Sequence, residues 1–157
     1  MFSNELVVEI LNYLDSNLYT KISILELSKH FNYNKDYIMR LFKRELNITI
    51  FDYLNQRRIL NSLQDYKYNY SSILNIALNY GFYSQEYYSE MFHKTIGVAP
   101  RTYLKFINHN INININNDEI NTIINRIASL EYKFRTIDNY KLNTKPSRQV
   151  KILSIFK

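Results

Sequence analysis

Basic side chains are the residues of this sequence whose types and spacing could do chemistry. Segment 35–44 holds two lysines and two arginines, and Arg57 and Arg58 follow it. An ammonium or guanidinium group pairs with phosphate, and a guanidinium can also bond two acceptors on a guanine edge in fixed geometry. The net charge of +6 favours an anionic partner, although an ordinary solvated surface is the other interpretation of a charge excess.

The residues that other kinds of chemistry require are missing. The 157 residues include no cysteine, which excludes disulfides and thiolate catalysis. The three histidines lack metal-ligand spacing, and no paired carboxylates, nucleophile–base set or phosphate-binding loop can be assembled. No apolar stretch approaches the roughly 20 residues of a membrane span, and no secretory signal is apparent. We therefore expect a cytoplasmic protein that is not an enzyme, with no metal, no cofactor and no membrane partner.

Helical spacing of apolar residues covers almost every stretch up to residue 106. Ser and Glu three residues apart form a capping box, and Asn can both cap a helix and adopt the left-handed backbone that ends one. We therefore expect an all-α fold. The helices predicted in the first part are 4–18, one opened by Ser23 and Glu26, 35–46 capped by Asn34, and 50–65 opened by Thr49 with Asp52 at its capping-box position.

The first helical pair recurs. Segment 24–47 aligns with 73–97, with one extra residue in the second turn. In each copy a small residue lets two helices cross closely, and Asn or Gly four positions later makes the sharp turn. Two similar units imply two similar surfaces, each a helix-turn-helix. The matched positions include Ser28 with Ala77, Asn32 with Gly81, and Asn47 with Gly97.

The sequence resembles the DNA-binding region of the AraC/XylS family of bacterial transcription regulators. The runs with this resemblance are DYIMRLFKRELNITIFDYLNQRRI (36–59) and 73–104, with its Tyr-Gly-Phe, its Ser-x-x-Tyr-Tyr-Ser and its Ile-Gly-Val-Ala-Pro. It covers about 4–106 and implies seven helices in two helix-turn-helix units. A connecting helix of ~24 Å, at ~1.5 Å per residue, could hold two reading helices in successive major grooves, which lie ~34 Å apart.

The resemblance also implies a domain organisation. It gives a DNA-binding domain at 1–106, divided into a first unit 1–49, a connecting helix 50–65 and a second unit 66–106. A linker at 107–117 and a tail at 118–157 follow. The chain is too short for the ligand-binding domain that many members carry, so it resembles the small stand-alone members.

In the first unit the reading helix is expected at 35–46. Arg40 matches the family's arginine before Leu/Met-Phe-Lys and could bond a guanine edge or a phosphate. An ion pair with Asp36 is the other interpretation of Arg40. Met39 could contact a thymine methyl. The candidates for DNA contact here are Lys35, Asp36, Met39 and Arg40, with Lys43, Arg44, Arg57 and Arg58 expected at phosphates.

The second reading helix, about 84–96, departs from the family. Glu90 stands where the family usually has arginine, opposite Arg40 in the repeat, and carboxylates are repelled by phosphates. We expect weaker engagement by this unit. The candidates here are Gln85, which can pair with adenine, and Glu86, Ser89, Glu90 and His93. Tyr37 and Tyr87 could bond phosphates or simply pack.

Two parts of the tail leave alternatives open. Segment 107–117 is a linker or a short strand, and 149–156 could form a terminal strand. Between them, apolar residues at alternating spacings of three and four form a seam that predicts a helix. This seam could make a homodimer through 120–137 or fold back on the domain. Its residues are Ile120, Ile123, Ile127, Leu130, Phe134 and Ile137.

We therefore expect a sequence-specific transcription regulator whose partners are double-stranded DNA and RNA polymerase. The alternative is a protein-interaction module with weak DNA binding, which associates through its C-terminal helix.

Overall fold

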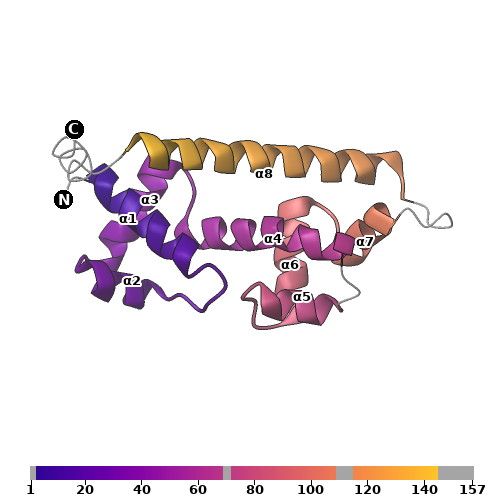
Figure 1. Ribbon diagram of the computed structural model, residues 1–157, viewed down its shortest axis with the longest axis horizontal. Helices are drawn as coiled ribbons and strands as arrows, with labels where there is room; N and C mark the ends of the chain where they lie inside the picture. The colour runs from indigo at the N-terminus through magenta and orange to yellow at the C-terminus, as the bar shows by residue number, and fades with distance from the viewer. Residues whose placement is uncertain (1–2, 69–71, 109–114, 145–157) are drawn as a thin grey trace, which may run out of the picture. The chain divides into compact units, whose positions relative to one another are not determined.

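The computed structural model describes residues 3–68, 72–108 and 115–144, and within them the regular structure is entirely α-helical (Figure 1). This confirms the predicted all-α class. The helices are α1 (Ser3–Ser16), α2 (Ile24–Phe31), α3 (Lys35–Leu46), α4 (Ile50–Tyr68), α5 (Ile73–Asn79), α6 (Gln85–Ile96), α7 (Pro100–Asn108) and α8 (Asn117–Asn143).

Helix starts follow the predicted caps. Ser23 and Glu26 form a complete capping box at α2, and Asn34 accepts a hydrogen bond from the Asp36 N–H at the start of α3. At α4 the Asp52 N–H donates to the Thr49 hydroxyl at 3.1 Å. Helix α4 is longer than the predicted 50–65, because it continues to Tyr68. Most of the predicted linker and the predicted strand at 149–156 lie outside the described residues.

The chain forms two compact units. Unit 1 comprises residues up to 17, 22–52 and the chain from 133, and unit 2 comprises 18–21 and 53–132. In unit 1, α3 packs against α1 and α2, and in unit 2, α6 packs against α5 and α7. Each reading helix is therefore held from two sides by other helices of its own unit.

The two units make their sharp turn in the same way. Asn32 and Gly81 both have left-handed backbone, with φ of 56° and 84°. One residue later, the Tyr33 N–H donates to the Ser28 carbonyl at 3.2 Å, and the Phe82 N–H donates to the Ala77 carbonyl at 3.0 Å. The repeat in the sequence is thus a repeat of backbone geometry.

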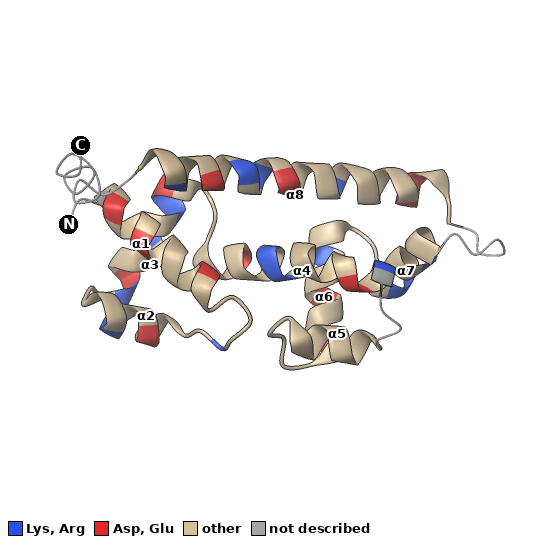
Figure 2. Cartoon of the chain, in the orientation of Figure 1, with Lys and Arg blue, Asp and Glu red and all other residues tan. Residues whose placement is uncertain are grey.

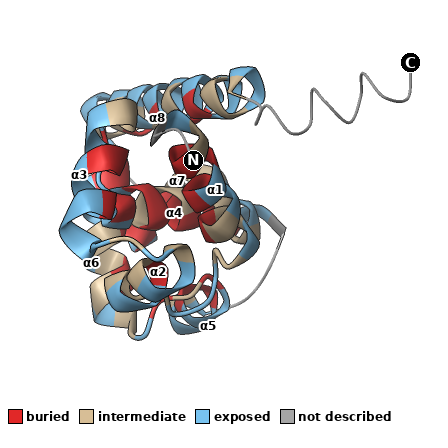
Figure 3. Ribbon diagram, turned by 90° about the vertical axis from the view of Figure 1, so that its left-hand side faces the viewer, coloured by how far each residue is buried: buried red, intermediate tan, exposed pale blue. Residues whose placement is uncertain are grey.

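Helix α8 uses its apolar seam within the chain. Four of the seam residues are buried, and Ile120 and Ile127 are half-buried. In Figure 3, buried positions recur along α8 between exposed ones. This burial agrees with the alternative that the seam folds back on the chain, and a homodimer through 120–137 stays a prediction. The four buried residues are Ile123, Leu130, Phe134 and Ile137.

Each half of α8 contacts the C-terminal end of one reading helix. In unit 1, the Tyr140 hydroxyl donates to Glu45 of α3 at 3.5 Å. In unit 2, Arg126 donates to the Lys94 carbonyl of α6 at 3.4 Å. Gly97 directly follows α6, and a Cβ placed there would clash with the Thr122 methyl carbon. Glycine at this position therefore permits the close approach of α8.

A buried hydroxyl cluster joins α4 to the second reading helix. The Tyr88 hydroxyl of α6 lies 2.9 Å from both the Ser62 and the Tyr66 hydroxyls of α4. Burial raises the pKa of the Tyr88 phenol to about 12, and it also raises the pKa of Tyr66. Both phenols are therefore held in their neutral form, which keeps the hydrogen-bonded cluster intact.

We expect Gly97→Ala to lower the free energy of unfolding by about 2 kcal/mol, because its φ of +90° is strained for alanine and the Thr122 methyl is in the way. The Thr122 hydroxyl donates to the Asp118 carbonyl at 2.8 Å, which fixes the methyl in place. Urea unfolding measures the effect. Adding Thr122→Ser to Gly97→Ala should restore the part of the free energy of unfolding that the clash with the methyl group removes. If Gly97→Ala alone were as stable as the unaltered protein, this packing of α8 would be contradicted.

We expect stability to fall as the pH rises from 10 towards 12. The unfolded chain loses phenol protons at its ordinary pKa near 10, whereas folded Tyr88 keeps its proton up to a pKa of about 12. Urea unfolding should give a lower free energy of unfolding at pH 11 than at pH 8, and Tyr88→Phe should make this loss smaller by about 1 kcal/mol. Tyr83→Phe, at a residue that is 79% exposed, is the control and should leave the loss unchanged.

Candidate nucleic-acid interface

Burial of one side of α3 turns its charged side outward. Ile38, Leu41 and Phe42 are buried at 0%, 2% and 0% exposure. Because a helix repeats every 3.6 residues, the positions between them face solvent. The Lys and Arg residues of α3 are blue and its acidic residues red in Figure 2. All six predicted contact residues of α3 are exposed, namely Lys35, Asp36, Met39, Arg40, Lys43 and Arg44.

Arg40 keeps most of its hydrogen-bonding capacity. Its Nε donates to the backbone carbonyl of Asp36 at 3.3 Å, rather than to the Asp36 carboxylate as an ion pair would require. A guanidinium has five N–H donors, so this contact leaves its outer edge able to bond two acceptors. The arrangement also holds the Arg40 side chain along the helix towards its N-terminal turn.

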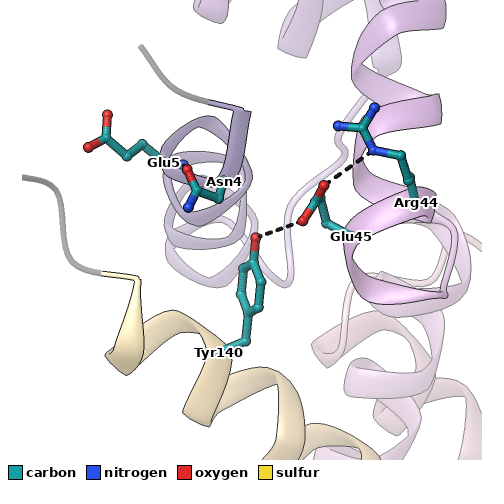
Figure 4. Close-up of polar contacts among 5 residues, drawn as sticks. All are labelled: Asn4, Glu5, Arg44, Glu45 and Tyr140. Atoms are coloured by element: carbon teal, nitrogen blue, oxygen red, sulfur yellow. Dashed lines mark hydrogen bonds and ion pairs between the residues drawn. The ribbon is translucent and has the colours of Figure 1, made fainter.

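The two later cations of α3 are partly engaged within unit 1. Lys43 donates to the Asn47 carbonyl at 3.2 Å, and Arg44 pairs with Glu45 at 3.2 Å. Figure 4 shows Glu45 between Arg44 and Tyr140, so that one carboxylate meets both. The Arg44 side chain is still 64% exposed, as a phosphate contact requires.

The structure separates the adjacent arginines of α4. Arg57 is half-buried and donates from Nε to the Tyr53 hydroxyl at 3.2 Å. Arg58 is only 8% exposed, and it donates to the Leu18 carbonyl at 2.6 Å and the Thr20 carbonyl at 2.8 Å. Burial lowers the pKa of Arg58. The prediction that Arg58 binds phosphate is therefore wrong, because its guanidinium holds the turn at 18–21 inside unit 2.

Helix α6 exposes the acidic residues Glu86 and Glu90, whereas the solvent side of α3 is mainly basic. Ser84 accepts a hydrogen bond from the Tyr87 N–H as its N-cap, and Tyr88 and Phe92 are buried. The five predicted contact residues all have access to solvent. Glu86, Glu90 and His93 are exposed, and Gln85 and Ser89 are half-buried.

His93 lies one helical turn after Ser89 and Glu90, near the C-terminal end of α6. It lines an open hollow of about 380 Å³ together with Gly97, Thr102, Asp118 and Thr122. These neighbours come from the end of α6, from α7 and from the start of α8, so His93 is grouped with the C-terminal end of the reading helix. Gln85 and Glu86 stand at its other end.

Among the described residues, no group of three or more His, Cys, Asp or Glu side chains could hold a metal ion. Within the same ranges, none of the helices combines the length and the apolar character that crossing a membrane requires.

We expect Arg58→Met to lower the free energy of unfolding by about 2 kcal/mol, because the Leu18 and Thr20 carbonyls lose a charged donor in a partly buried site. Arg57→Met is the matched control one residue away. Its effect on the free energy of unfolding should be smaller, because half-buried Arg57 donates to the Tyr53 hydroxyl of its own helix. Urea unfolding of both variants makes the comparison. A larger loss in Arg57→Met would contradict these assignments.

Comparisons with known proteins agree with this geometry. The family model described as a helix-turn-helix domain matches residues 27–105, half of the chain. The HTH-type transcriptional activator AarP of Providencia stuartii is 26% identical over 102 residues, which are 65% of this chain and 76% of that protein. The transcriptional regulatory protein HptR of Staphylococcus aureus is 36% identical over 99 residues, 63% of this chain and 39% of that protein. The chain thus spans about three quarters of AarP and two fifths of HptR.

Solved structures share the fold. The C-terminal domain of AraT, a response regulator from Geobacillus stearothermophilus, has a TM-score of 0.61 at 24% identity, covering 64% of this chain and 84% of that one. The DNA-binding domain of AdpA, solved with a target DNA, has a TM-score of 0.60 at 16% identity, covering 67% and 95%. A regulator with an AraC-type DNA-binding domain from Chromobacterium violaceum has a TM-score of 0.57 at 22% identity, covering 65% and 91%. Together with two capped helix-turn-helix units in one chain, these matches show that the protein belongs to the AraC family of DNA-binding transcription regulators.

Proposed function

We propose that this regulator binds an asymmetric duplex DNA site with α3 as its main base-reading helix and α6 as a weaker contact. The observation that supports this most directly is the outward face of α3, where Arg40 is exposed with an unused donor edge above a buried apolar side. Duplex DNA as the ligand also agrees with the target DNA in the AdpA structure.

The chemistry of the α3 face divides into two roles. Arg40 can bond the O6 and N7 acceptors of guanine together, which distinguishes guanine from other bases. The exposed Met39 beside it offers an apolar contact for a thymine methyl. Lys35, Lys43 and Arg44 add phosphate contacts, which give affinity and salt dependence but little specificity.

The acidic residues of α6 weaken its contribution. Glu86 lies in the first turn, where the helix dipole offsets its charge. Glu90 is one turn further on and exposed, so its carboxylate would repel an approaching phosphate. Because the same position in α3 is Arg40, the two units present opposite charges from equivalent places in the repeat.

The proposed protein partner and location follow from the role of a bacterial transcription regulator. RNA polymerase is the expected protein partner, and the cytoplasm is the expected location, since that is where bacterial DNA lies. The placement of both reading helices in successive major grooves of one duplex stays a prediction. A footprint of one protein copy on its site would test it, with protection of two regions about one helical turn apart, ~34 Å, as the expected result.

We expect Arg40→Gln to weaken binding to the preferred duplex by about 10- to 100-fold and to relax selection for one guanine. The preferred duplex comes from selection out of a randomised library, and gel shifts at moderate salt measure affinity. Failure to enrich any motif would refute sequence-specific binding by this chain.

Glu90→Arg is the converse change at the matched position of α6. It should tighten binding to the preferred and unrelated duplexes and steepen the dependence on salt by roughly one ion, as a new phosphate contact would. Unchanged affinity would mean that α6 is not near the duplex. That result would favour the alternative of a protein-interaction module with weak DNA binding.

A further inference from the structure

We propose that a stacked pair of tyrosines at the start of each reading helix, Tyr33 with Tyr37 and Tyr83 with Tyr87, contacts the sugar–phosphate backbone of DNA. This inference rests on the proposed function and adds to it. The pairs would position each reading helix at its groove without reading bases.

The two pairs have the same geometry at the same place. Tyr33 and Tyr37 stack with ring centroids 5.4 Å apart and an interplanar angle of 23°, and Tyr83 and Tyr87 stack at 4.9 Å and 18°. In each unit the first tyrosine directly precedes the N-cap and the second is the third residue of the helix. The pair thus recurs with the 50-residue offset of the repeat, although the charges around it do not.

Each pair has one exposed and one half-buried tyrosine. Tyr83 is 79% exposed and Tyr37 is 36% exposed, whereas Tyr33 and Tyr87 are half-buried. The next residue in each helix, Ile38 or Tyr88, is the one that enters the core, with 0% exposure in both cases. In unit 1 half-buried Tyr33 stacks on exposed Tyr37, and in unit 2 exposed Tyr83 stacks on half-buried Tyr87, so each pair presents one ring to solvent.

Helix geometry places the second tyrosine at the edge of the reading face. Successive residues are rotated by about 100°, which puts Tyr37 between Arg44 and buried Leu41 around α3. The same rotation puts Tyr87 beside exposed Lys94 around α6. When the first turns of a helix meet base edges, its flanking positions meet the phosphates that line the groove.

The hydroxyl of half-buried Tyr87 accepts a hydrogen bond from α4 and keeps its own proton to donate. Asn55 of α4 donates from its side-chain nitrogen to the Tyr87 oxygen at 3.0 Å. Because this bond occupies a lone pair of the phenol oxygen, the hydroxyl proton is directed to a different acceptor, and a donor polarised in this way bonds an anionic oxygen more strongly. A phosphate oxygen is the acceptor that a DNA backbone supplies.

Replacing all four tyrosines by phenylalanine tests the proposal, because the rings and their stacking remain while four hydroxyl donors are lost. We expect binding to the preferred duplex and to an unrelated duplex of equal length to weaken by a similar factor, roughly tenfold. The slope of log affinity against log salt should stay unchanged, because a neutral donor releases no counterion. Lys43→Gln should instead reduce that slope.

Tyr132→Phe is the matched control, since Tyr132 is 70% exposed on α8 and should not affect binding. Urea unfolding of the fourfold variant confirms that it is folded at the assay temperature, and Tyr37→Phe with Tyr87→Phe alone serves if it is not. Unchanged affinity for both duplexes, or a loss confined to the preferred duplex, would overturn the proposal. Failure of the unaltered protein to bind any duplex would refute the proposed function instead, so the two outcomes are distinguishable.

Discussion

Burial of the apolar side of each reading helix is the interaction on which the rest of the structure depends. Ile38, Leu41 and Phe42 of α3, and Tyr88 and Phe92 of α6, allow only one rotation of each helix about its axis. The exposed face follows from that rotation, because a residue at the wrong angle would bury a charge. The caps at Asn34 and Ser84 fix where each helix starts, so both its rotation and its first residue are determined.

On this common frame the two units differ in charge and not in architecture. The turn hydrogen bonds, the left-handed residues and the tyrosine pairs recur, while Arg40 is replaced by Glu90. Exposed positions tolerate such exchanges, because a surface substitution changes stability little. A duplicated fold can therefore keep its structure and give one copy the larger part in DNA binding.

Helix α8 adds to this frame from outside the segment that the family model matches. It contacts Glu45 in one unit and the Lys94 carbonyl in the other, both in the last turn of a reading helix, and Lys141 also pairs with Asp15 of α1. In the first turns of the reading helices, the candidates Lys35, Asp36 and Glu86 are exposed to solvent. Four residues of the apolar seam of α8 are buried within the chain.

The sequence by itself determined the helices, their caps, the repeat and the outward face of α3, because each of these depends on residues within a few positions of one another. It also showed the charge difference between Arg40 and Glu90, since the repeat aligns them. Only the tertiary structure decided that Arg58 is buried and Arg57 half-buried. These two are chemically identical neighbours, and which one is buried depends on carbonyl groups about 40 residues away. The tertiary structure also decided that the seam of α8 is buried within the chain and that α8 approaches Gly97 closely. Contacts of this kind form between segments that are far apart in the chain, so no local sequence pattern predicts them.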